Sequence, residues 1–327
     1  MAWRRNWAKS ACFKPQFPTS SMSHIPVLLN EATEGLEIAA GDVFVDATLG
    51  AGGHTEEVCR LFGRSVRLIA VDRDQGAIER SRKRLAQYPC DVVYVNDNFR
   101  NFSTILNDLS MPAVDKVLFD LGFSSDQLVP PEELEDEEGR GFSFQRDEPL
   151  LMTYERDPSA SSLTAKEIVN EWPEEKLAEL LRELGEEKFA NRIAGAIVLR
   201  RKERNIETSG DLANVVKQAV PPNYERGRIH PATRTFQALR IAVNGELTAL
   251  SEALKAAWKR LNPQGRIAVI SFNSLEDRIV KRYFKELSTQ GGELIVKKPI
   301  TASGDEIKAN PRARSAKLRI IKKEKFS

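Results

Sequence analysis

The chain has 327 residues, of which 41% are hydrophobic and 29% charged, and its formal net charge is +2. This composition is typical of a globular protein with a sizeable core, built as one large domain or as two. It contains no apolar run long enough to span a bilayer, and its near-neutral charge creates no overall field that would attract nucleic acid.

The three cysteines, Cys12, Cys59 and Cys90, are widely spaced and form no CxxC pair. We therefore expect neither a disulfide framework nor a metal site, and a reducing cytoplasm is the natural setting. Residues 1–23 are basic, lack acidic side chains and have no long apolar stretch, so we expect them to be a disordered extension rather than a secretory signal.

From residue 43 to residue 120, short apolar runs alternate with amphipathic stretches. The apolar runs predict strands at 43–45, 67–71, 92–95 and 116–119. The stretches between them predict helices at 53–62, 75–86 and 101–109. Strands that alternate with helices are typical of a parallel sheet with both faces covered.

The pattern changes between residues 127 and 230, where no strand is predicted. Helical spacing predicts helices there at 165–171, 173–184, 186–202 and 211–219, with Gly185 as a left-handed C-terminal residue and Ser209 as an N-cap. Beyond residue 230 the sequence predicts a long helix at 233–261, a strand at 266–271, a helix at 276–287 and strands at 293–297 and 316–321. We therefore expect a sheet domain formed by residues 24–126 and 231–327, with an all-helical domain of residues 127–230 inserted.

The strongest local signal is the stretch DATLGAGGH at residues 46–54, which follows a strand and opens a helix. Glycines there let the backbone approach a ligand, and Asp72, which ends the next strand, can accept both hydroxyls of a ribose. The Gly-x-Gly-Gly spacing and the preceding acid, Asp46, favour S-adenosylmethionine over a dinucleotide, although a purely structural turn is the alternative. His54 is a candidate for the methionine carboxylate, or simply a polar residue at a helix start.

Three further residues at or just after strand ends are candidates. Phe99 follows the third strand, where it can line an adenine pocket or pack as a core aromatic. Asp120 ends the fourth strand and can orient a base amine towards the methyl donor, contact the cofactor, or cap a loop. Phe123 can stack on a flipped base or pack in the core. A cytosine amine is a poor nucleophile, so positioning and electrostatics should dominate such a transfer.

Basic residues from separate segments are candidates for contact with an RNA backbone; ordinary surface charge is the alternative. These candidates are Arg234, Arg240, Arg278, Arg312 and Arg314.

Several ordered strings in the chain resemble the bacterial 16S rRNA cytosine-N4 methyltransferase family, also called the MraW type. They are the residues 24–32, 46–54, 70–74, 120–127, 140–144, 185–189, 230–240, 274–278 and 310–315. The resemblance implies a Rossmann-like class I S-adenosylmethionine-dependent methyltransferase sheet with an inserted helical domain. It also implies methylation of N4 of a cytidine in the decoding region of 16S rRNA, within the small ribosomal subunit. The implied cofactor contacts are Gly52, Gly53, His54, Asp72, Phe99, Asp120 and Gln127, of which Gln127 rests on the resemblance alone.

Three departures from the family pattern bear on catalysis or substrate choice. Asn273 stands where the family usually has His, so its catalytic role is in question, and Leu151 and Thr153 stand where the family usually has Asp and Arg. These departures keep two alternatives open: a methyltransferase of the same fold with another substrate, and a non-catalytic ribosome-assembly factor. The oligomeric state is also open, and a homodimer is one of the states that the sequence allows.

Overall fold

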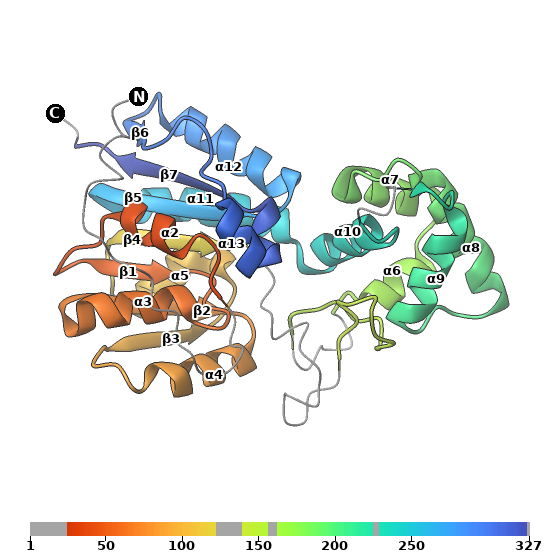
Figure 1. Cartoon of the computed structure of the whole chain (residues 1–327), viewed down its shortest axis with the longest axis horizontal. Coiled ribbons are helices and arrows are strands. Elements are labelled where there is room, and N and C mark those ends of the chain that lie inside the picture. Colours follow the sequence, from red (N-terminus) through yellow and green to blue (C-terminus); the bar gives the residue numbers. More distant parts are fainter. Residues whose placement is uncertain (1–24, 122–138, 156–161, 225–228, 326–327) are drawn as a thin grey trace.

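The computed structural model describes residues 25–121, 139–155, 162–224 and 229–325. The expected extension at residues 1–23, the first cysteine Cys12, and the site candidates Phe123 and Gln127 lie outside these ranges. Within them the chain forms a sheet-containing part and a separate group of helices (Figure 1). No helix in the described ranges is long and apolar enough to cross a membrane.

Seven strands of the described chain form one sheet in the order β3-β2-β1-β4-β5-β7-β6. The strands β1 to β5 run parallel, whereas β7 is antiparallel to both β5 and β6. This mixed α/β sheet confirms the fold class predicted from the sequence. The bounds are β1 (Val43–Asp46), β2 (Arg67–Asp72), β3 (Val92–Asn96), β4 (Val114–Asp120), β5 (Leu261–Ser271), β6 (Gly292–Leu294) and β7 (Lys317–Lys323).

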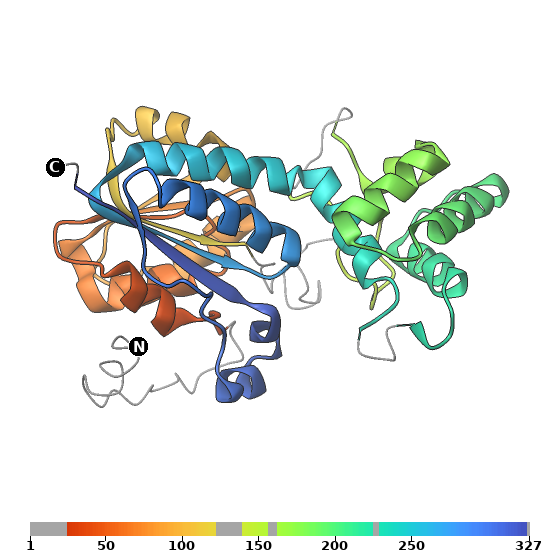
Figure 2. The same cartoon turned by 90° about the horizontal axis from the view of Figure 1, so that it is seen from above.

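Helices cover both faces of the sheet, and each face buries its own apolar core (Figure 2). One face carries α5 (Phe102–Asp108), α11 (Glu246–Arg260) and α12 (Ser274–Leu287). The other carries α2 (Leu29–Leu36), α3 (Gly53–Phe62) and α4 (Gln75–Leu85), with the short α13 (Gly304–Ala309) near its edge. Because both faces are covered, most of the parallel strands contain continuous apolar runs, and that is why they could be recognised in the sequence.

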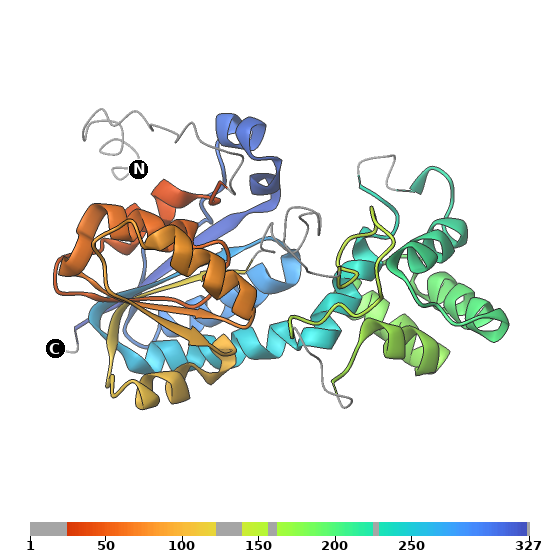
Figure 3. The ribbon, with the colours of Figure 1, turned by 90° about the horizontal axis from the view of Figure 1, so that it is seen from below.

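The separate group of helices packs around a third core, which includes Ile168, Leu181, Ile193, Leu212 and Leu239. It consists of α6 (Ala165–Glu171), α7 (Glu174–Gly185), α8 (Ala190–Glu203), α9 (Ser209–Ala219) and α10 (Thr233–Asn244). Figure 3 shows α10 and α11 leading from this group onto the sheet part. We therefore propose that the inserted helical domain extends to the end of α10, and we call α6–α10 with residues 139–155 the helical domain.

The prediction of one long helix at 233–261 is wrong. The chain forms α10 and α11, which are separated by Gly245 in the left-handed conformation, at φ 59°. Glycine adopts this conformation without steric cost, so it ends the first helix and turns the chain into the second. The apolar spacing continues across the joint, and for that reason it gave no sign of the break.

Two predicted helix ends are also wrong in detail. The left-handed residue after α7 is Glu186, at φ 49°, while Gly185 is the last helical residue. Gly185 is needed for packing instead, since a Cβ there would lie 2.8 Å from the carbonyl oxygen of Arg234 in α10. The N-cap of α9 is Thr208, whose hydroxyl accepts a hydrogen bond from the backbone of Asp211, and not Ser209.

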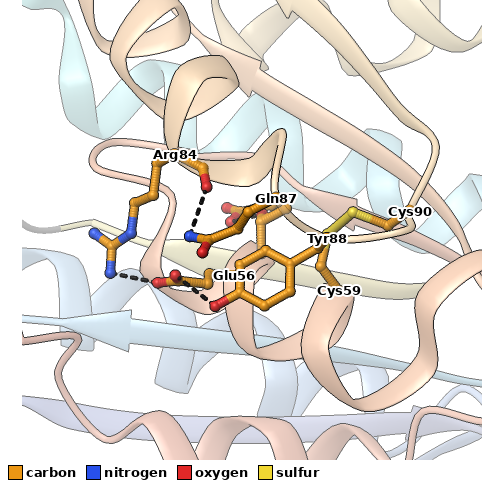
Figure 4. The surroundings of a disulfide bond; sticks show 8 residues. Glu56, Cys59, Arg84, Gln87, Tyr88 and Cys90 are labelled. Carbon is orange, nitrogen blue, oxygen red and sulfur yellow. Dashed lines mark hydrogen bonds and ion pairs between the residues drawn. A yellow bond between two sulfur atoms is a disulfide. The ribbon is translucent and has the colours of Figure 1, made fainter. Parts of the chain in front are cut away.

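The expectation that no disulfide forms is wrong as well. Cys59 of α3 and Cys90, which follows α4, form a disulfide across 31 positions of sequence, with their Cα atoms 5.5 Å apart (Figure 4). Nearby, Glu56 accepts a hydrogen bond from the hydroxyl of Tyr88 at 2.9 Å and forms an ion pair with Arg84. The fold brings α3 and the chain after α4 together, so the wide spacing of the cysteines along the sequence was no guide to their pairing.

Candidate active site

A cleft lies at the carboxyl ends of β1, β2 and β4, where parallel α/β sheets usually bind ligands. The structure brings three predicted site residues together there: Asp72, Phe99 and Asp120. The cleft is also lined by Thr48 and Gly50 of the predicted glycine loop, and by residues that the sequence analysis did not single out, including Leu121, Tyr154, Glu246 and Glu276.

The carboxylate of Asp72 is tied to the glycine loop that follows β1. Its Oδ2 accepts a hydrogen bond from the backbone N–H of Gly50 at 2.7 Å, and its Oδ1 accepts one from Asp74 at 2.9 Å. Burial raises the pKa of Asp72 to about 6, and the neighbouring charge of Asp74 contributes. A carboxylate has about four acceptor positions, so each oxygen keeps capacity for a ligand hydroxyl.

Gly52 and Gly53, predicted cofactor contacts, have clear steric roles in the structure. Gly52 has φ 76°, and a Cβ there would lie 2.9 Å from the hydroxyl oxygen of Ser81. A Cβ on Gly53 would lie 2.2 Å from Cγ of Pro26. The two glycines therefore let the loop pack against α4 and the segment before α2, and neither of them lines the cleft.

The buried carboxylate of Asp46 stabilises the same loop but lies outside the cleft lining. It accepts hydrogen bonds from the hydroxyl of Thr55 at 2.7 Å and from the backbone of Thr48 at 3.2 Å, and burial raises its pKa to about 6. Asp46 does not line the cleft. Thr48 in turn accepts a hydrogen bond from the backbone N–H of Asp120 at 2.6 Å, which ties the loop to the end of β4.

His54 lies behind Asp120. Its Nδ1 is 3.6 Å from Oδ2 of Asp120, and its Nε2 is 3.2 Å from the carbonyl oxygen of Val27. The imidazole is buried and does not line the cleft. The ring therefore lies between the segment before α2 and the reactive end of β4.

Phe99 combines the two interpretations that the sequence left open. Its ring contacts Phe119 edge-on at 5.9 Å, as a core aromatic does, and it also lines the cleft beside Asp97. A partly exposed aromatic at this position can pack against a planar ligand ring.

A buried network forms the far wall of the cleft and was missed by sequence reasoning. The hydroxyl of Tyr154 donates to Glu246 at 3.1 Å, and Arg240 pairs with Glu246 at 2.8 Å and with Glu276 at 3.8 Å. Burial raises the pKa of Glu276 to about 7, although Arg240 lowers it. Burial also raises the pKa of Tyr154. These residues come from three separate segments, so no local spacing could have grouped them.

Asn273, the residue in place of the family's His, caps α12. Its side-chain oxygen accepts hydrogen bonds from the backbones of Leu275 and Glu276, both at 3.0 Å, and Glu276 completes a capping box. Asn273 does not line the cleft, whereas Glu276 does. In this structure Asn273 therefore acts by holding Glu276.

The structure places the five predicted RNA-contacting arginines in different surroundings. Arg240 is buried in the cleft network, and Arg234 and Arg278 both approach Glu186, whose carboxylate lies 2.6 Å from the guanidinium of Arg278. Arg312 and Arg314 are exposed on a short 3-10 turn at residues 311–315.

Known proteins resemble this chain over almost its full length. Residues 21–324 match the model of a family described as the MraW methylase family. A protein named ribosomal RNA small subunit methyltransferase H from Brevibacillus brevis is 44% identical, with 93% of this chain and 99% of that protein covered. Proteins of the same name from Symbiobacterium thermophilum and Clostridium botulinum are 44% and 43% identical over 92% of this chain, with 96% and 98% of their own lengths covered.

Similarity to solved structures is weak by comparison. A putative methyltransferase from Streptococcus mutans, solved in complex with SAH, is 14% identical with a TM-score of 0.43, over 92% of this chain and 99% of that chain. The family match and the curated relatives therefore decide the assignment: the chain belongs to the MraW methylase family and is an S-adenosylmethionine-dependent methyltransferase.

Proposed function

We propose that the protein transfers a methyl group from S-adenosylmethionine to N4 of a cytidine in the decoding region of small-subunit rRNA. The observation that carries this proposal is the meeting of Asp72, Phe99 and Asp120 in one cleft at the carboxyl edge of the sheet. The names of the curated relatives support the choice of small-subunit rRNA as substrate. This substrate would place the reaction in the cytoplasm.

The cleft residues fit S-adenosylmethionine. The carboxylate of Asp72 would accept hydrogen bonds from the two ribose hydroxyls, and the ring of Phe99 would pack against the adenine. The backbone at Gly50 allows close approach of the ligand. The cofactor carries no phosphate, so an acid at the end of β2 and another at the end of β4 are compatible with it. When bound, it supplies a methyl group activated by a sulfonium.

Asp120 is the residue that we expect to orient the target amine. A carboxylate that accepts hydrogen bonds from the N–H groups of the amine holds the nitrogen lone pair towards the methyl group, and no strong base is needed before attack. Thr48 holds the backbone of Asp120 at 2.6 Å, and His54 lies 3.6 Å from its carboxylate. Both contacts position the acid, so most of the catalytic contribution of the chain lies in orientation.

The three departures named above lie outside the cleft lining. Asn273 caps a helix, Thr153 is buried and accepts a hydrogen bond from the backbone of Glu155, and Leu151 is half-buried. None of the three lines the cleft. This placement favours the same reaction over a changed substrate or a non-catalytic assembly role.

The proposal is tested with small ribosomal subunits from a strain that lacks the gene. Labelled S-adenosylmethionine should introduce label into small-subunit rRNA, and mass spectrometry of the nucleosides should identify N4-methylcytidine. The variant Asp120→Asn should lose at least about 100-fold in rate, because orienting groups in a transition state contribute at this level. Its matched control is Asp108→Asn, since Asp108 is exposed at the end of α5.

Two results would contradict the proposal. One is an absence of label in the rRNA although calorimetry shows that the cofactor binds, which would favour the assembly role. The other is label that resides at C5 or on the ribose, which would show that another atom is the acceptor.

A further inference from the structure

A second cleft lies in the helical domain, away from the strand ends. It is formed by residues 144–147, by one side of α9 and by His230 just before α10, and it encloses about 270 Å³. This volume is several times that of one water molecule in the liquid. None of the residues proposed above for the cofactor or the target amine belongs to it.

The cleft is built from fixed backbone. The buried hydroxyl of Ser209 donates to the carbonyl of Arg146 at 2.7 Å and accepts from the N–H of Glu148 at 3.1 Å. The N–H of Gly210 donates to Asp147 at 3.2 Å, and a Cβ on Gly210 would lie 2.5 Å from that carboxylate. The segment 144–147 is therefore held against the first turn of α9 before any ligand binds.

One wall of the cleft is aromatic. Phe144 and His230 stack with their ring centroids 4.4 Å apart and 14° between their planes, and Phe236 supports Phe144 edge-on at 5.4 Å. Nδ1 of His230 accepts a hydrogen bond from the N–H of Ala232 at 3.2 Å. Burial and the charge of Lys217 lower the pKa of His230, so the wall is uncharged at neutral pH.

Two cations flank this wall. Arg146 and Lys217 both line the cleft, and Lys217 is exposed on α9. In the described part of the chain Lys217 forms no ion pair, whereas Arg146 lies 4.0 Å from Glu148. An aromatic wall beside a cation is the combination with which proteins bind single-stranded nucleotides, because the ring packs against the base and the cation contacts the phosphate.

Two stretches of chain lead from this second cleft to the cleft at the strand ends, where methyl transfer is proposed. The first runs from Phe144 to Tyr154, and Phe142, two residues before Phe144, stacks on the ring of Tyr154 at 5.3 Å. The second runs from His230 through α10 to Glu246. The 12 residues of α10 span about 18 Å at 1.5 Å per residue, which corresponds to several nucleotides of an extended strand.

We propose that the second cleft binds an unpaired nucleotide of the substrate RNA, a few positions from the cytidine that is methylated. Its base packs against the wall formed by Phe144 and His230, and its phosphate lies near Lys217 and Arg146. This subsite rests on the proposed function, because it assumes that the substrate is RNA. It assigns to the helical domain the recognition of RNA beyond the target base.

The test is a charge reversal, Lys217→Glu, compared with the matched control Lys202→Glu. Lys202 is exposed on α8 of the same domain and does not line the cleft. Methyl transfer to unmodified small subunits should show KM raised about tenfold for Lys217→Glu, with kcat within twofold, because a phosphate contact is replaced by repulsion. The control should change neither constant, and binding of S-adenosylhomocysteine should be the same in both variants.

A second pair of variants tests the aromatic wall. His230→Ala should raise KM about fivefold or more, and His230→Phe should restore most of the loss, because stacking tolerates either ring. Thermal unfolding of each variant shows whether the domain is folded. Equal KM values, within twofold, for Lys217→Glu and Lys202→Glu overturn the subsite.

Direct binding of small subunits, measured by filter retention beside the transfer assay, separates the two proposals. If the wild type transfers methyl groups but Lys217→Glu binds and turns over subunits like Lys202→Glu, only the subsite is wrong. If the wild type transfers nothing while Lys217→Glu still binds subunits about tenfold more weakly than the control, the subsite stands and the proposed function is wrong.

Discussion

The affinity of the protein for its cofactor should depend on pH through Asp72. Burial raises the pKa of this carboxyl from its ordinary 3.8 to about 6, so it is ionised at pH 7 and mostly protonated at pH 5. Only the ionised form can accept hydrogen bonds from both ribose hydroxyls while it also accepts those from Gly50 and Asp74. Affinity should therefore fall as the pH drops from 7 through 6 to 5.

The size of this effect follows from the pKa. At pH 5 roughly one molecule in ten carries the ionised carboxylate, so the Kd for S-adenosylhomocysteine should be about tenfold higher than at pH 7. The α-carboxyl and α-amino groups of the ligand titrate outside this interval. Asp72→Asn should bind about 10- to 150-fold more weakly at pH 7, because it loses charge-assisted hydrogen bonds of about 1.5–3 kcal/mol, and its Kd should change much less than tenfold between pH 5 and pH 7.

Isothermal titration calorimetry at pH 5, 6 and 7 measures these values. The matched control is Asp46→Asn, because Asp46 also has a raised pKa, of about 6, but lies behind the loop and does not line the cleft. Asp46→Asn should keep the pH dependence. The reasoning is refuted if the Kd of the folded wild type at pH 5 is within twofold of its Kd at pH 7. It is also refuted if the Kd of Asp72→Asn shows the same tenfold change between these pH values.

Three further changes should affect stability, and chemical unfolding measures each of them. Gly53→Ala places a methyl group where Cγ of Pro26 would be 2.2 Å away, so it should lower the free energy of unfolding by about 1–3 kcal/mol; an unchanged value would show that the segment before α2 moves aside freely. Cys90→Ser removes the cross-link to Cys59 over 31 positions and should cost about 3–4 kcal/mol under oxidising conditions, a difference from the wild type that should vanish when both proteins are fully reduced. Asn273→Ala removes the cap of α12 and should cost about 1 kcal/mol, whereas Asn273→Asp should keep the cap, so equal losses in the two variants would speak against the capping role.

Much of the sheet part could be predicted because its strands are buried on both faces and are therefore continuous apolar runs. The acids that end these runs, Asp72 and Asp120, could be recognised as site candidates by position alone, since the carboxyl ends of parallel strands share one edge. The structure places both in the same cleft.

The features that were missed depend on contacts between distant segments. Glu276 belongs to a helix start and Tyr154 to an irregular segment, and only the packing of α10 and α11 brings their side chains to one wall. The break at Gly245 escaped notice for a similar reason, because the apolar spacing is the same on both sides of it. The pairing of Cys59 with Cys90 likewise depends on how α3 and α4 pack, which the spacing of cysteines does not report.

The joint at Gly245 has a consequence for how the two parts of the enzyme communicate. Arg240 and Glu246 lie on opposite sides of this single residue and form an ion pair at 2.8 Å. Glu246 also accepts a hydrogen bond from the hydroxyl of Tyr154 at the cofactor cleft, the cleft at the strand ends that contains Asp72. A turn of the helical domain about the joint would change these contacts together. Any ligand that favours one orientation of the helices then alters affinity at the cofactor cleft, and thermodynamic reciprocity requires the cofactor to alter affinity for that ligand by the same factor.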